Sequence, residues 1–200
     1  MIQFNQYLNE EDEESPADLI IKNCQPFLKK IGYKVTKYPL YRGMDENSKV
    51  VKKTVRKNRK PLDTKIEIHN MLNDAFYKKF KIKARSECIF VAGYESFSAD
   101  FGRLFYIFPI GNFKFLWSPK IKDLFNKVGG FKIYSKTKSE METIFKKLVD
   151  KYQKTDLKKA IKSHHEIMID CKEYYAVRKY GYKKEPFLVT LRKEIQNEKI

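Results

Sequence analysis

Residues 88–117 read CIFVAGYESFSADFGRLFYIFPIGNFKFLW, and this stretch decides the fold class. It contains three short segments rich in aromatic and β-branched residues, at 88–92, 104–110 and 113–117. Glycines separate these segments, which is typical of consecutive strands joined by short connections. We therefore expect the middle of the chain to be mainly β-structure, with a short helix over 95–101 between the first two strands.

The part of the chain before this stretch has mostly helical spacing. A helix is predicted over 16–32, because it has proline in its first turn and glycine at its end. Residues 62–80 repeat apolar positions every three to four residues, which predicts another helix. Between them, 33–41 favours a strand, whereas 45–61 is polar and basic and is expected to form a loop.

The part of the chain after this stretch combines a helix with further strands. Residues 138–162 are basic with an apolar stripe, which predicts a helix. The segments EIMI at 166–169 and YYAV at 174–177 predict short strands, and 187–191 predicts a last one. Helices therefore precede a mainly β region, and the predicted fold class is α+β.

The composition supports one domain over 16–200, preceded by an acidic leader over 1–15. Hydrophobic residues make up 42% of the 200-residue chain, which is enough for a sizeable core. No apolar run approaches the ~20 residues that span a bilayer, so no membrane contact is expected. Cys24, Cys88 and Cys171 lie far apart, and the leader lacks signal-peptide features. Both observations favour a reducing, cytoplasmic location.

The net charge is strongly positive. The chain has 42 Lys and Arg residues against 25 Asp and Glu, a formal charge of +17. Such a charge favours polyanionic partners, and nucleic acid is the first of these. The alternative interpretation is a lysine-rich composition that has no bearing on function.

Several common kinds of site have no motif in this sequence. It has no glycine-rich phosphate loop and no GxSxG serine motif. His164 and His165 are adjacent, and neighbouring side chains of a strand point to opposite faces, so the pair cannot hold one metal ion. We expect no metal site.

Two charged residues interrupt apolar, strand-like segments. Arg42 lies between Tyr41 and Gly43, and arginine is seldom buried without a partner. Its planar guanidinium suits phosphate, although an edge-strand salt bridge would also explain it. Glu166 opens the EIMI segment, where its carboxylate either points into a cleft or faces solvent.

Taken together and in order, these segments resemble the ADP-ribosyltransferase superfamily, in its arginine–serine–glutamate branch. LYRG at 40–43 resembles the first motif, and 89–102 resembles the second, a strand followed by a short helix. Ala-Gly-Tyr at 92–94 stands where the branch usually has Ser-Thr-Ser. The segment 166–177 resembles the motif with the catalytic glutamate. The stretch RKNRKP at 56–61 is similar to one found in toxin-like members of the superfamily. The lysine-rich composition with an acidic leader also resembles that of bacteriophage effectors.

The resemblance implies N-terminal helices on a split core of two antiparallel sheets, and it implies site residues. Arg42 would hold the NAD⁺ phosphates, Glu166 would be catalytic, and His164 would take the acceptor-selecting position on the same strand face. The other residues implied to contact NAD⁺ are Tyr41, Gly43, Phe90, Tyr94, Ser96 and Phe101. The basic residues expected to contact the acceptor are Lys52, Lys53, Arg56 and Arg59.

The predicted function is that of an NAD-dependent mono-ADP-ribosyltransferase. Glu166 would stabilise the positive charge that develops on the ribose as nicotinamide leaves. NAD⁺ is then a substrate, and the reaction needs no metal. The acceptor would be DNA, RNA or an acidic or nucleic-acid-associated protein, and the charge favours nucleic acid. Two alternatives stay open: a non-catalytic basic nucleic-acid-binding protein, and an NAD glycohydrolase with water as acceptor.

Overall fold

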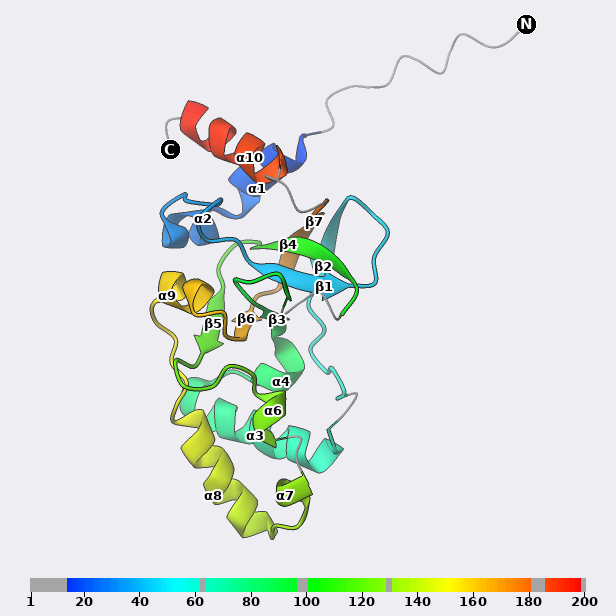
Figure 1. The fold of residues 1–200 in the computed structure, drawn as a ribbon, viewed down its shortest axis with the longest axis vertical. Helices are drawn as coiled ribbons and strands as arrows, with labels where there is room; N and C mark the ends of the chain where they lie inside the picture. Colours follow the sequence, from blue (N-terminus) through cyan, green and yellow to red (C-terminus); the bar gives the residue numbers. More distant parts are fainter. Residues whose placement is uncertain (1–13, 62–63, 97–100, 129–130, 181–185, 199–200) are drawn as a thin grey trace, which may run out of the picture.

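The computed structural model describes residues 14–61, 64–96, 101–128, 131–180 and 186–198 (Figure 1). Two antiparallel sheets form its centre. The four-stranded sheet has the order β1-β4-β7-β2, and the three-stranded sheet has the order β3-β6-β5. The strands are β1 (Tyr41–Met44), β2 (Val50–Thr54), β3 (Ile89–Val91), β4 (Arg103–Pro109), β5 (Lys114–Trp117), β6 (Ile167–Asp170) and β7 (Glu173–Arg178). The predicted α+β class is confirmed, and the residues described form two antiparallel sheets.

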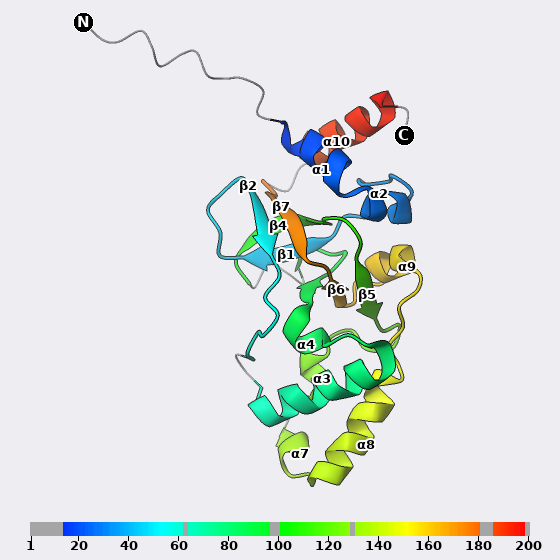
Figure 2. The same cartoon turned by 180° about the vertical axis from the view of Figure 1, so that it is seen from behind.

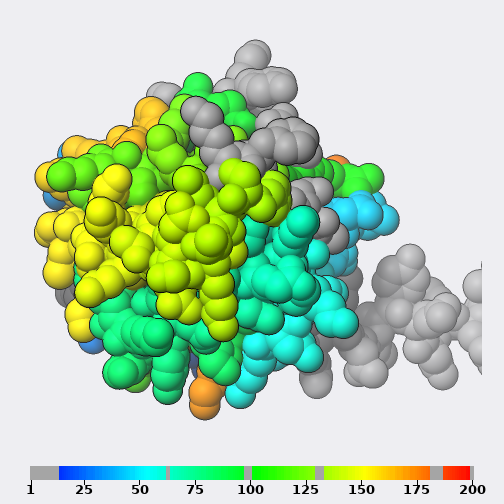
Figure 3. All heavy atoms as spheres, turned by 90° about the horizontal axis from the view of Figure 1, so that it is seen from below, coloured from blue at the N-terminus to red at the C-terminus, as the bar shows by residue number. Residues whose placement is uncertain are grey.

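The helices lie at both ends of this β centre (Figures 1 and 2). Those beside the four-stranded sheet are α1 (Pro16–Asn23), α2 (Gln25–Ile31) and α10 (Pro186–Asn197). Those beside the three-stranded sheet are α3 (Ile66–Phe80), α4 (Ala84–Glu87), α6 (Phe125–Val128), α7 (Phe131–Tyr134), α8 (Lys138–Val149) and α9 (Leu157–Lys162). Seen from below, α3 and α8 make up most of one end of the molecule (Figure 3).

The three-stranded sheet separates two hydrophobic cores. In β6, Ile167 and Ile169 belong to the core that includes the four-stranded sheet, whereas Met168 belongs to the core under α3 and α8. In β3, Phe90 packs on the second core while its neighbours Ile89 and Val91 face the first. This is the alternation of a strand that is covered on both faces.

Local sequence explains the helix ends. The Ser15 hydroxyl accepts the amide of Asp18, whose carboxylate accepts the amide of Ser15, so a capping box starts α1. The predicted helix is two helices, since α1 ends at Cys24 and α2 begins with a proline in its first turn. The predicted end at glycine is confirmed, because Gly32 has φ 65° and caps α2.

Two predicted boundaries were wrong because long-range pairing overrides local pattern. The segment predicted as a loop over 45–61 contains β2, which pairs with β7 along its whole length. The segment 33–41 consists mainly of turns, and its strand begins only at Tyr41.

Two predictions about the C-terminal half were also wrong. The helix predicted over 138–162 is divided into α8 and α9, because Gln153 exchanges two backbone hydrogen bonds with Trp117. The strand predicted over 187–191 is part of α10. Leu188, Leu191 and Ile195 are buried at helical spacing there, and the helix packs against α1.

Some predictions concern residues outside those described. The acidic leader lies there except for its last two residues, and most of the short helix predicted over 95–101 does as well. Within the described ranges, no helix is long and apolar enough to cross a bilayer.

Candidate active site

Arg42 lies where the two sheets meet. Tyr41 and Ala92 exchange two backbone hydrogen bonds, of 2.7 and 3.0 Å, which join β1 to the end of β3. The next residue of β1, Arg42, donates from its guanidinium to the backbone carbonyl of Phe90 at 2.9 Å. Burial lowers the pKa of Arg42, and its buried Nε has no hydrogen-bond partner among the residues described. The guanidinium is therefore held in place with donor capacity left over.

Phe90 also holds two further arginines through its ring. The guanidinium carbon of Arg59 lies 4.2 Å from the ring centroid, and that of Arg85 lies 5.4 Å from it. Both distances are within the range of a cation–π contact. One phenylalanine thus contacts three arginines, two through its side chain and one through its carbonyl group.

Arg59 is fixed by the backbone of α4. Its side chain donates to the carbonyl of Arg85 at 3.0 Å, and its amide donates to the carbonyl of Ser86 at 3.3 Å. Burial lowers the pKa of Arg59 to about 10, and the charges of Arg42 and Arg85 contribute in the same direction. Arg59 is thus close enough to both Arg42 and Arg85 for their charges to repel it.

Arg85 is held by a polar network between α3 and α4. The side-chain oxygen of Asn73 accepts the amides of Arg85 and Ser86, at 2.9 and 3.2 Å. The Ser86 hydroxyl contacts the side chains of Asn73 and His69. Arg85 is buried, and its Nε has no hydrogen-bond partner in the described part of the chain. These bonds position α4, and with it Arg85, before any ligand arrives.

Glu166 is the acidic member of this group, and it lies immediately before β6. Its amide donates to the carbonyl of Lys122 at 2.8 Å, and its side chain is only 8% exposed. Burial raises the pKa of Glu166 to about 7, with a further contribution from Asp123. Arg85 and Arg59 lower the pKa by less than burial raises it. At neutral pH the carboxyl group is therefore present in both protonation states.

The charges of the group do not balance. Arg85 and Arg59 act on one carboxyl group that is only partly ionised at neutral pH, and Arg42 adds a third positive charge near Arg59. Among the described residues, none of these arginines forms an ion pair with an acidic side chain, and Oε1 of Glu166 has no hydrogen-bond partner. Buried cations without counter-ions are costly. We call Arg42, Arg59, Arg85, Phe90 and Glu166 the arginine cluster. Its arrangement suits an anionic ligand.

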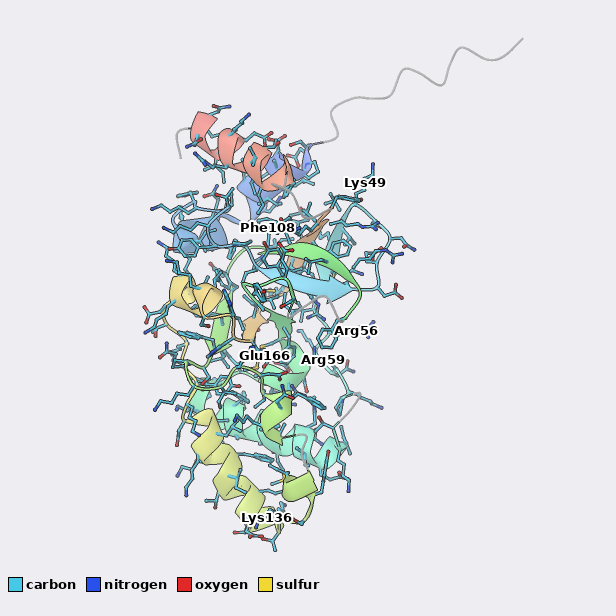
Figure 4. The ribbon with its side chains drawn as sticks, in the orientation of Figure 1. Lys49, Arg56, Arg59, Phe108, Lys136 and Glu166 are labelled. Carbon is cyan, nitrogen blue, oxygen red and sulfur yellow. The ribbon has the colours of Figure 1, made fainter. Side chains whose placement is uncertain are left out.

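The structure brings together four of the residues predicted from the sequence, namely Arg42, Arg59, Phe90 and Glu166. Figure 4 shows Arg59 level with Glu166, between the four-stranded sheet and the helices below it. Arg85 was not among the residues predicted from the sequence. The signal available was weak, since Arg85 follows the buried Ala84 and closely precedes an apolar strand.

His164 is not on the predicted strand face. It lies in the turn before β6 with φ 59°, so the alternation of a strand does not relate it to Glu166. Its exposed ring instead stacks on Tyr94, with centroids 4.6 Å apart. The argument that His164 and His165 point to opposite strand faces also fails, because both precede the strand. Among the described residues, no cluster of three or more potential metal ligands occurs.

The other residues predicted to contact NAD⁺ lie around the cluster rather than in it. Tyr41 is buried against Tyr106, at a ring distance of 5.2 Å. Gly43 lies in β1 and pairs with Leu104 of β4. Ser96 is exposed, as are Tyr94 and Phe101.

The predicted acceptor residues differ in their surroundings. Lys52 and Lys53 lie in β2 and form ion pairs with Glu173 at 3.0 Å and Glu46 at 2.8 Å. Arg56 is exposed on the segment that leads from β2 to Arg59. The two lysines are therefore partly neutralised, whereas Arg56 faces solvent.

The glycine at position 93 has a steric explanation. A Cβ atom on Gly93 would lie 1.9 Å from the carbonyl oxygen of Ile161 in α9. Neither serine nor threonine fits at that position while α9 packs as it does.

An open groove of about 1070 Å³ lies at the other end of the molecule, between α3 and α8. Met71, Ala75, Met141 and Val149 are among its lining residues, and no member of the arginine cluster is. The cluster, with its unpaired buried groups, is therefore the better candidate for chemistry. No protein-family model, curated protein or solved structure matches this chain.

Proposed function

We propose that this protein is an NAD-dependent mono-ADP-ribosyltransferase and that the arginine cluster is its active site. The observation that supports the proposal is the buried Glu166 carboxyl group, which has an unpaired oxygen and is acted on by the charges of Arg59 and Arg85. Arg42 lies next to Arg59, where the two antiparallel sheets meet. The order of Arg42 and Glu166 along the chain, each at a strand, agrees with the resemblance to that superfamily.

The reaction needs an anion clamp and a carboxylate. Arg42 binds the pyrophosphate of NAD⁺ through its free donor capacity and orients the dinucleotide. The bond between the ribose C1′ atom and the nicotinamide nitrogen breaks, and its electron pair leaves on the nicotinamide. The ionised Glu166 stabilises the positive charge that develops on the ribose, as carboxylates do beside similar cations in glycosidases. The acceptor then bonds to C1′ and releases its proton to solvent.

The net charge of +17 favours nucleic acid as the acceptor over a neutral or basic protein. The same charge also favours the second candidate, a basic nucleic-acid-binding protein without activity. Binding alone does not explain a buried carboxyl group whose pKa is raised to about 7 within the cluster. Such a perturbed group is typical of catalytic sites. Hydrolysis of NAD⁺ differs from transfer only in its acceptor, which is water.

The test is incubation of the full chain with labelled NAD⁺ and cell lysate divided into protein, RNA and DNA fractions. We expect label in a nucleic-acid fraction and loss of about 10²-fold or more in rate for Glu166→Gln. Glu142→Gln is the matched control, because Glu142 is exposed on α8 and lies outside the cluster. Free ADP-ribose without labelled macromolecule would identify a glycohydrolase. No consumption of NAD⁺ by wild type would exclude both enzyme functions.

A further inference from the structure

A strongly basic segment, residues 49–60, connects to the arginine cluster through Arg59. Residues 49–60 read KVVKKTVRKNRK and contain seven Lys or Arg residues and no acidic one. The segment runs through β2 and past Arg56, and Figure 4 shows Lys49, Arg56 and Arg59 following one another toward the level of Glu166. Arg56, Lys57 and Lys60 are exposed, and no ion pair of theirs occurs among the described residues. This segment therefore provides a positively charged path from the surface to the site.

Arg59 and Arg85 form a pair that is separate from Arg42. Both contact the ring of Phe90, and both act electrostatically on Glu166. Arg42 is instead anchored to the carbonyl of Phe90 from β1. The pair is preorganised, because Arg59 is bonded to the backbone of α4 and α4 is bonded to Asn73. A preorganised pair of guanidinium groups with an unpaired buried Nε suits a phosphate group.

We infer that Arg59 and Arg85 form a second phosphate subsite, which binds a backbone phosphate of a nucleic-acid acceptor next to Glu166. A dinucleotide has two adjacent phosphates, and in the proposed function Arg42 binds both of them. A nucleic acid has a phosphate at every nucleotide, and its neighbouring phosphates are then met by the exposed side chains of Arg56 and Lys60. The acceptor assignment rests on the proposed function, whereas the phosphate subsite does not.

The experiment measures binding without turnover. Fluorescence anisotropy of a labelled ten-nucleotide single strand is recorded at several salt concentrations for wild type, Arg59→Gln, Arg85→Gln and Lys57→Gln. Lys57→Gln is the matched control, since it removes one charge from the same segment but lies outside the cluster. We expect the two arginine variants to bind about tenfold more weakly, with a salt slope smaller by about 0.7, and Lys57→Gln to lose less than about threefold.

A second titration with ADP-ribose identifies the source of the phosphate. The inference predicts that Arg59→Gln binds ADP-ribose with less than about a twofold change, and that Arg42→Gln loses ADP-ribose affinity. Weaker ADP-ribose binding by Arg59→Gln, with normal oligonucleotide binding, would assign the subsite to the dinucleotide and overturn the acceptor assignment. Equal losses for Arg59→Gln and Lys57→Gln would show general charge attraction and overturn the subsite. Circular dichroism of each variant establishes that it is folded.

These results separate the inference from the proposed function. If wild type binds the oligonucleotide through Arg59 and Arg85 but does not consume NAD⁺, the phosphate subsite stands and the transferase proposal fails. If label is transferred while the arginine variants keep wild-type oligonucleotide affinity, the transferase proposal stands and the subsite fails.

Discussion

The guanidinium group of Arg59 lies 4.2 Å from the ring centroid of Phe90, although Arg59 lies in the segment after β2 and Phe90 lies in β3. The same ring lies 5.4 Å from the guanidinium of Arg85. Phe90 thus contributes more than packing to β3, because its ring contacts two cations of the site.

Phe90→Leu tests this role. Leucine keeps an apolar side chain but cannot form cation–π contacts, so Arg59 and Arg85 each lose one of the contacts that hold them. We expect kcat/KM for transfer to fall about tenfold, with a loss of about 1 kcal/mol in the free energy of unfolding. Phe113→Leu is the control, since the Phe113 ring contacts Lys30 at 5.9 Å and is not part of the cluster. Equal losses of activity in the two variants would mean that Phe90 acts through packing alone.

The pH dependence of the rate should reflect Glu166. Because transfer needs the ionised carboxylate and its pKa is raised to about 7, we expect kcat/KM to rise with pH and to level off above about pH 8. Initial rates measured between pH 5 and 9 provide the profile. A rate that is already constant at pH 5 would contradict a role for this carboxylate.

Glu166→Gln should stabilise the fold at high pH. The folded state binds the Glu166 proton up to about pH 7, whereas the unfolded chain releases it near 4.5. The contribution of Glu166 to the free energy of unfolding is therefore greatest below the unfolded pKa and decreases as pH rises from there to about 7. Above pH 7 the difference amounts to about 3 kcal/mol at most.

Urea unfolding of wild type and Glu166→Gln at pH 5 and pH 8 measures this effect. Glutamine carries no charge, so the variant should be the more stable protein at pH 8, and its advantage should shrink at pH 5. An advantage that is equal at both pH values would indicate a packing effect instead of a titration.

Gly93→Ala should destabilise the protein strongly. The new Cβ atom would collide with the backbone of Ile161, which can move only if α9 moves. Gly111→Ala is the control, because Gly111 has open space around it. Its φ of 63° strains an alanine backbone by about 1 kcal/mol, without any collision. Thermal unfolding should show a much larger loss for Gly93→Ala. Similar melting temperatures would mean that α9 packs elsewhere in solution.

Local pattern was sufficient for the elements whose conformation depends on neighbouring residues. The apolar segments at 88–92, 104–110 and 113–117 form strands, and glycine ends the second helix. Arg42 and Glu166 were also identified, because a charged residue inside an apolar segment is visible in the sequence. Local pattern was insufficient for β2, which is a strand because it pairs with β7, and for α10, whose apolar residues pack on α1.

The sequence by itself determined the α+β class and the approximate places of β3 to β7, and it identified Arg42, Phe90 and Glu166 as candidate site residues. Tertiary structure alone decided that Arg85 joins Arg59 at Phe90, that Gly93 meets α9, and that His164 lies in a turn. The physical reason is the distance along the chain over which each interaction acts. Side-chain periodicity and glycine placement act on the backbone within a few residues. Arg59 and the Arg85 carbonyl, 26 positions apart, meet only once α3 and α4 have packed against the sheet. The raised pKa of Glu166 likewise depends on burial, which arises only when the whole chain has folded.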